Sequence, residues 1–63
     1  MATILRSVRE ESGLNQRELA EKVHMPQSLI CDLELGKRKP WPNAIKKISA
    51  VLGVSGAYIF PNG

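Results

Sequence analysis

The sequence predicts an all-α fold of five short helices, forming a single domain over residues 1–63. Three observations predict this fold. Apolar residues recur at helical spacing, Gly and Pro divide the chain at short intervals, and no stretch alternates polar and apolar residues as a β-strand does. We expect helices at about 3–12, 16–23, 27–35, 42–52 and 55–60.

The first two expected helices have clear limits. Gly13 ends the first helix, and Asn15 with Glu18 has the spacing of a capping box, in which each side chain binds the other residue's backbone N–H. The second helix therefore begins directly after Asn15. The inward faces are expected to carry Ile4, Leu5 and Val8 in the first helix and Leu19, Ala20 and Val23 in the second.

Proline and glycine delimit the third and fourth helices. Pro26 suits the start of the third helix because it has no N–H that needs a partner, and Gly36 suits the left-handed residue at its end. Pro42 and Gly53 delimit the fourth helix in the same way, and "KRKPWP" before it must be a loop. The inward residues are expected to be Ile30 and Leu33, then Ile45, Ile48, Val51 and Leu52.

Basic residues gather directly after the third expected helix. The chain has 9 Lys and Arg against 6 Asp and Glu, which gives a net charge of +3. Five of the nine lie within the eleven positions after Gly36, with no acid among them: Lys37, Arg38, Lys39, Lys46 and Lys47. This pattern fits an anionic partner, although a solvated basic loop and helix face would give it as well.

Several classes of protein are disfavoured by the composition. Cys31 is the only cysteine, so no intrachain disulfide can form. No apolar run approaches the roughly 20 residues of a membrane span, and no secretory signal opens the chain, so we expect a cytoplasmic protein without membrane contact. One His and one Cys make neither a zinc site nor a convincing nucleophile pair, so we expect no enzyme, metal or cofactor.

Two short helices joined by a few residues, the first of them capped, are typical of a helix-turn-helix. From residue 4 to residue 60 the chain resembles the phage-repressor and Cro-type family, also called the xenobiotic-response-element family. The resemblance rests on "LRSVREESGLNQRELAEKV", "QSLICDLELGKRKP" and "ISAVLGVS". It implies a lambda-repressor-like fold with a helix-turn-helix unit at about 15–36, whose third helix lies in the major groove of double-stranded DNA. It also implies a prokaryotic or phage-encoded transcriptional repressor that binds a two-fold symmetric operator as a homodimer.

The resemblance also assigns roles to single residues. Gln27 matches a base-reading position, and its amide can pair with adenine N6 and N7. Ser28 and Asp32 match neighbouring contact positions. Asp32 can accept from cytosine N4 or disfavour other bases, and a solvated Asp at the edge of the groove is the alternative. The expected phosphate contacts are Asn15, Gln16, Arg17, Lys37, Arg38 and Lys39.

Two further assignments concern structure and assembly. An acid in the last turn of a helix opposes the helix dipole, and the resemblance pairs Glu34 with Arg9 on the first helix. The expected dimer contacts are Tyr58, Ile59 and Phe60. A second hypothesis is a protein-interaction module on the same fold that has lost DNA binding and uses the surface of Leu29, Cys31 and Leu35. The basic run together with Gln16 and Gln27 favours DNA.

Overall fold

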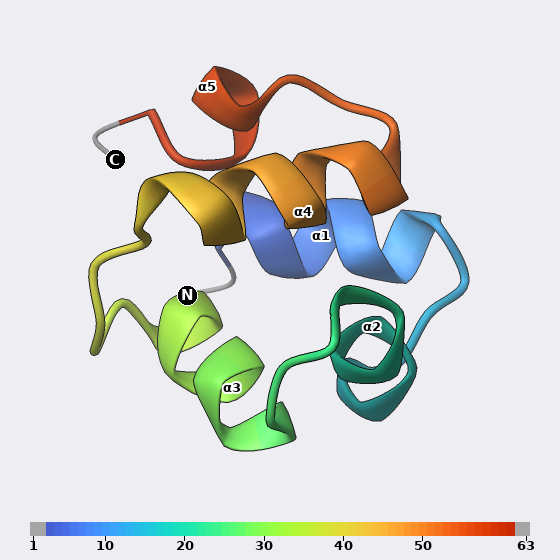
Figure 1. The fold of residues 1–63 in the computed structure, drawn as a ribbon. Coiled ribbons are helices and arrows are strands. Elements are labelled where there is room, and N and C mark those ends of the chain that lie inside the picture. The colour runs from blue at the N-terminus through green and yellow to red at the C-terminus, as the bar shows by residue number, and fades with distance from the viewer. Residues whose placement is uncertain (1–2, 62–63) are drawn as a thin grey trace.

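The computed structural model describes residues 3–61, and all the regular secondary structure in that range is helical. The helices are α1 (Ile4–Glu11), α2 (Gln16–Val23), α3 (Gln27–Leu35), α4 (Pro42–Leu52) and α5 (Gly56–Ile59). In Figure 1, α2 and α3 lie below α1 and α4, and α5 lies above α4. The all-α prediction is confirmed. None of the helices within residues 3–61 has the length and apolar character needed to cross a bilayer.

Local structure explains where α2 begins and where α3 ends. The Asn15 Oδ1 atom accepts from the Glu18 N–H at 2.7 Å, and the Glu18 Oε1 atom accepts from the Asn15 N–H at 2.9 Å, so the capping box at the start of α2 is complete. Gly36 ends α3 with φ 73°, in the left-handed region where a Cβ atom is disfavoured. These ends leave eight residues in α2 and nine in α3.

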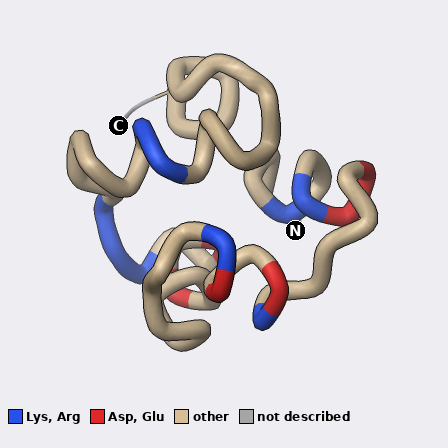
Figure 2. The backbone as a smooth tube through the Cα atoms, turned by 45° about the vertical axis from the view of Figure 1, so that its right-hand side comes forward, with Lys and Arg blue, Asp and Glu red and all other residues tan. Residues whose placement is uncertain are grey.

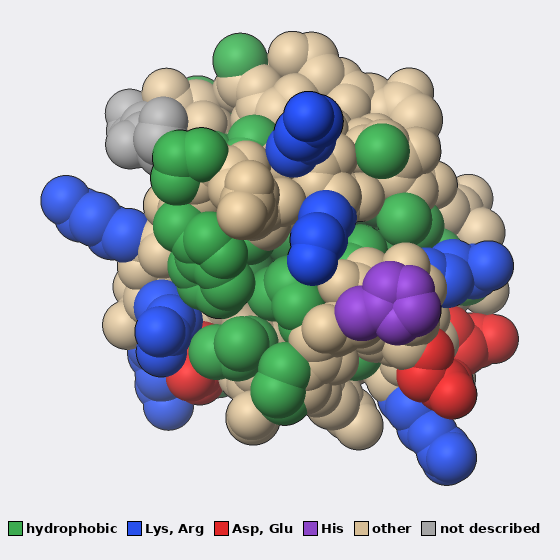
Figure 3. All heavy atoms as spheres, viewed as in Figure 1, with side chains coloured by type: hydrophobic (Ala, Val, Ile, Leu, Met, Phe, Trp, Pro, Cys, Tyr) green, Lys and Arg blue, Asp and Glu red, His purple; other side chains and the backbone are tan. Residues whose placement is uncertain are grey.

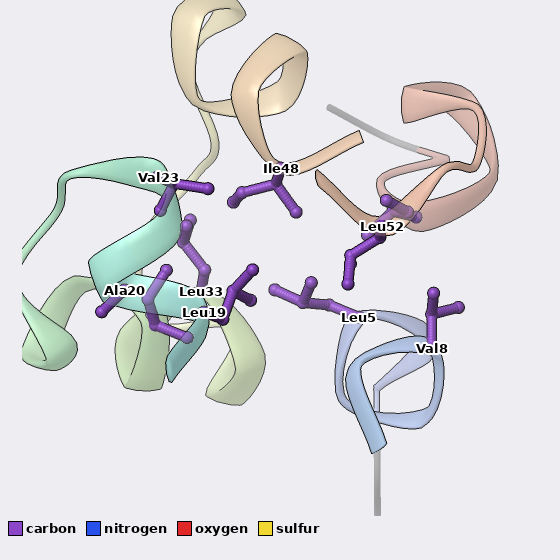
Figure 4. Close-up of a cluster of buried hydrophobic side chains, with 10 residues drawn as sticks. Leu5, Val8, Leu19, Ala20, Val23, Leu33, Ile48 and Leu52 are labelled. Carbon is purple, nitrogen blue, oxygen red and sulfur yellow. The ribbon is translucent and has the colours of Figure 1, made fainter. Parts of the chain in front are cut away.

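The core lies where the first four helices meet. Figure 4 shows side chains from α1, α2, α3 and α4 directed toward one another. The largest fully buried side chains, each at most 1% exposed, are Leu5, Leu19, Val23, Ile30 and Ile48. Ile59 extends this cluster from α5. Because α2 and α3 both contribute to the same core, its packing fixes their relative orientation.

Two residues expected to face inward lie at the surface instead. Ile4 is 39% exposed and Val51 is 36% exposed. In α4 the buried residues are Ala44, Ile48 and Leu52, which are spaced four residues apart along one face. The buried face of α4 therefore includes the small Ala44 side chain, and Val51 lies outside this face.

Close packing between α4 and α5 leads to a prediction at Gly56. A Cβ atom at this position would clash with the Cγ2 methyl of Ile45, a group on a branched carbon that cannot easily move away. We expect Gly56→Ala to lower the free energy of unfolding by about 1–3 kcal/mol, as overpacking usually does. Urea denaturation measures this loss. In an Ile45→Ala background the methyl is gone, so the same substitution should cost much less; an equal cost in both backgrounds would contradict this origin.

Candidate nucleic-acid interface

A tight turn of three residues, His24 to Pro26, joins α2 to α3. His24 adopts the left-handed conformation with φ 56° and ψ 46°, the one positive φ of a non-glycine residue in the described chain. Its N–H donates to the Glu21 carbonyl at 3.3 Å, and the Met25 N–H donates to the Ala20 carbonyl at 3.0 Å. His adopts this conformation more readily than most non-glycine residues, so the turn forms without a glycine.

The outward face of α3 carries the expected base-reading residues. Gln27 and Ser28 are exposed in the first turn, while Asp32 is half-buried further along the helix. Leu35 is 61% exposed, the highest value among the large hydrophobic residues described. This face offers amide, hydroxyl and carboxylate groups to a partner but no cation, so electrostatic attraction to an anion must come from its surroundings.

The start of α2 lies beside the end of α3, and one hydrogen bond joins the two helices. Gln16 Nε2 donates to Glu34 Oε1 at 3.0 Å, and the Gln16 side chain is half-buried. Asn15 uses its side-chain oxygen to cap α2, and Arg17 is exposed. Of these three expected phosphate contacts, only Arg17 has a side chain without a described hydrogen bond or ion pair inside the protein.

Glu34 is also held by Arg9, which the resemblance names as its partner. Arg9 Nε donates to Glu34 Oε2 at 2.5 Å, and Arg9 Nη2 donates to Glu34 Oε1 at 3.1 Å. Arg9 Nη1 donates to the Leu14 carbonyl at 2.9 Å. Both charged side chains are buried, at 8% and 3% exposed. Hydrogen bonding to Glu34 raises the pKa of Arg9 above its ordinary value although burial opposes this, so the guanidinium stays charged.

The loop between α3 and α4 supplies the cations that α3 lacks. Lys37, Arg38 and Lys39 are all exposed, and Figure 2 shows them as one stretch of cations, which uncharged residues separate from a second stretch on α4. The Arg38 guanidinium lies 5.4 Å from the centre of the Trp41 ring, within the range of a cation–π interaction. The exposed Arg38 side chain therefore lies over a ring that is itself half-buried.

The charged groups are not evenly spread over the surface. On the face shown in Figure 3, Lys and Arg side chains project around a group of hydrophobic side chains, and most of the visible acids gather at one edge, over α2. Within residues 3–61 no group of three or more His, Cys, Asp and Glu side chains is arranged to hold a metal ion.

The three residues expected at a dimer interface lie in different surroundings. Tyr58 is 59% exposed, while Ile59 is only 4% exposed and packs in the protein's own core. Phe60 is half-buried and packs against that core. Of the three, Tyr58 is the most exposed.

The comparisons with known proteins agree with this geometry. The helix-turn-helix family matches residues 5–59, which is most of the chain. The chain belongs to this helix-turn-helix family. An archaeal protein of Methanothermobacter thermautotrophicus, described as "Uncharacterized HTH-type transcriptional regulator", is 40% identical over 53 residues, 84% of this chain and 77% of that protein.

A second relative of this helix-turn-helix protein comes from the yeast Yarrowia lipolytica. It is described as "Putative multi-protein-binding factor 1" and is 37% identical over 46 residues, 73% of this chain. The match covers 30% of the yeast protein's length. No solved structure gives a significant match to the chain.

Two contacts of this helix-turn-helix protein were not expected from the sequence. One is the hydrogen bond from Gln16 to Glu34, which are 18 positions apart, a separation at which local patterns carry no information. The other is the stacking of Arg38 on Trp41. The sequence holds a signal for the contact between Arg38 and Trp41, because these residues are three positions apart in a loop that contains two prolines.

Proposed function

We propose that this helix-turn-helix protein is a sequence-specific regulator of transcription that binds double-stranded DNA. It acts in the cytoplasm as a repressor, and two copies bind a two-fold symmetric operator, with Tyr58 at their contact. Each α3 lies in the major groove, where Gln27, Ser28 and Asp32 meet the edges of bases. Membership of the helix-turn-helix family supports the DNA-binding role.

One observation carries the proposal beyond family membership. The polar outward residues of α3 stand next to three exposed cations of the following loop. Base edges are read by hydrogen-bonding groups, whereas most of the affinity of such proteins comes from neutralised phosphates. In this chain adjacent segments perform these two functions: α3 recognises base edges, and Lys37 to Lys39 neutralise phosphates.

Selection from a pool of random duplexes at two salt concentrations tests this function. We expect enrichment of a motif with two-fold symmetry, whose half-sites lie about one helical turn apart. Retention should fall steeply at the higher salt concentration, since phosphate contacts release counterions. Failure to enrich any duplex at either concentration would overturn the proposal.

The basic loop leads to a second prediction, for Lys39→Ala. This substitution should weaken binding to all duplexes by a similar factor and reduce the slope of log K against log salt by about 0.9. Fluorescence anisotropy with a selected duplex and a scrambled duplex, over a salt series, measures both effects. Lys22→Ala is the matched control, because it removes the same charge from an exposed position on α2. Equal slopes for the two variants would show that Lys39 does not contact phosphate.

A second candidate function is a protein-interaction module. Two observations favour it: the name of the yeast relative refers to binding of proteins, and Leu35 is exposed on a face of α3 that has no cation. Such a module would use Leu29, Cys31 and Leu35 and would not need the basic loop. The duplex selection separates the two candidates, because the module would enrich no motif.

A further inference from the structure

Arg38 and Trp41 form a pair in the loop between α3 and α4. The Arg38 guanidinium lies 5.4 Å from the centre of the Trp41 ring. An arginine that stacks on an aromatic face keeps its N–H groups free in the plane of the guanidinium. Within residues 3–61 the ion pairs join other residues, so the Arg38 N–H groups are available to an anion.

The Trp41 indole provides a second donor at the same place. Its Nε1–H group can only donate a hydrogen bond, and none of the described residues accepts from it. In the described part of the chain, no buried or half-buried side chain keeps an unpaired nitrogen or oxygen atom shielded from water. Since Trp41 is half-buried, its indole N–H must reach the solvent. An unpaired neutral donor therefore lies beside an unpaired cation.

The backbone around Trp41 is restricted on both sides. Pro42 confines the residue before it to extended conformations, and Trp41 accordingly has φ −110° and ψ 162°. The Trp41 carbonyl accepts from the Ile45 N–H at 3.0 Å, which ties Trp41 to the first turn of α4. Pro40 has a fixed φ of its own. A ligand that binds here meets a backbone that is already ordered, so its binding costs less conformational entropy.

We propose that Trp41 is a DNA-contacting residue: its indole N–H donates to a backbone phosphate that Arg38 binds at the same time. This inference rests on the proposed function. Both groups donate and neither accepts, which suits the charged oxygens of a phosphodiester, since these only accept. The edges of most base pairs offer donors as well as acceptors and suit the pair less well.

The proximity of the two groups allows one phosphate to bind both. With hydrogen bonds of about 2.9 Å, two oxygens of one phosphate can reach a guanidinium and an indole that lie this close together. The two contacts differ in their dependence on salt. Binding by Arg38 releases counterions, whereas the neutral indole contributes a hydrogen bond without changing the charge of the interface.

A double-mutant cycle over a salt series tests the proposal by fluorescence anisotropy. Trp41→Phe keeps an aromatic face for Arg38 but removes the N–H. It should weaken binding to a duplex of mixed sequence about threefold to tenfold, the range of one hydrogen bond, and leave the slope of log K against log salt unchanged. Arg38→Gln should lower that slope by about 0.9. In the Arg38→Gln background, Trp41→Phe should change the affinity less than twofold, because the shared phosphate is no longer held.

The outcomes separate the indole contact from a purely structural role of the ring. If Trp41→Phe lowered the salt slope as Arg38→Gln does, the ring would act only by holding Arg38, and the inference would be overturned. Equal effects of Trp41→Phe in the two backgrounds would overturn the shared phosphate. If the wild type binds no duplex, the proposed function fails and the inference with it. If the wild type and Trp41→Phe bind duplexes equally well, the inference alone fails.

The unmodified protein provides a second test, which does not require any variant to fold. Trp41 is the only tryptophan in the sequence, so NMR shows a single signal for an indole N–H. Addition of the duplex should shift this signal downfield and slow the exchange of its proton with water, because the N–H gains a charged acceptor. A signal that stays in place at saturating duplex, or a proton that exchanges as fast as in the free protein, would overturn the proposal.

Discussion

Glu34→Ala is expected to lower the free energy of unfolding by about 3–5 kcal/mol. The substitution leaves the Arg9 guanidinium buried without its carboxylate, and Gln16 loses its acceptor as well. A chain of 63 residues has a total stability of roughly 3–9 kcal/mol at the usual value per residue, so this loss removes a large part of it. Urea denaturation followed by circular dichroism measures the change.

The exposed ion pair of Arg6 and Glu10 on α1 provides the matched control. These side chains are more than half exposed, and their closest charged atoms lie 3.5 Å apart. Glu10→Ala should cost less than about 1 kcal/mol, because water already screens this pair. If Glu34→Ala cost no more than Glu10→Ala, the buried pair between α1 and α3 would contribute no more to stability than the exposed pair.

Leu19→Ala is expected to have the second large effect, a loss of about 2–5 kcal/mol. The Leu19 side chain is 0% exposed and lies in the core shared by α1, α2, α3 and α4. Removing its outer methyl groups leaves a cavity that the surrounding helices cannot fill without moving. Thermal unfolding should show a large fall in the melting temperature, since one kcal/mol shifts the midpoint of so small a domain by several degrees.

Leu35→Ala is the matched control, because it makes the same substitution at an exposed position. Leu35 lies on α3 with 61% of its surface exposed, so the same truncation removes little buried contact. We expect its effect to stay within about 0.5 kcal/mol. Equal effects at the two positions would contradict the assignment of Leu19 to the core.

The helix limits could be predicted from the sequence because each depends on residues close together in the chain. The capping box of Asn15 and Glu18, and the glycines at the helix ends, act over three or four positions. The five observed helices begin and end within one residue of the expected limits. The inner face of α4 was harder to predict, because Ala44 is small and does not mark that face as a large apolar side chain would.

The candidate site was predictable in its residue types but not in its contacts. The positions of Gln27 and of the loop from Lys37 to Lys39 follow from local patterns and from the family resemblance. The link from Gln16 to Glu34 depends on how α2 and α3 meet in space. Ile59, expected at a subunit contact, lies in the core of the protein itself, because its burial depends on how α5 packs against the other helices.

The central claim is that α3 reads base pairs while its neighbours supply affinity. It is tested most directly by duplex selection carried out in parallel with the wild type and Gln27→Ala. We predict that the wild type selects a two-fold symmetric motif and that the variant loses its preference at one base pair in each half-site. There the discrimination should fall by about 1–3 kcal/mol, and the preference should be kept elsewhere. Identical motifs for the two proteins would contradict the placement of α3 in the major groove.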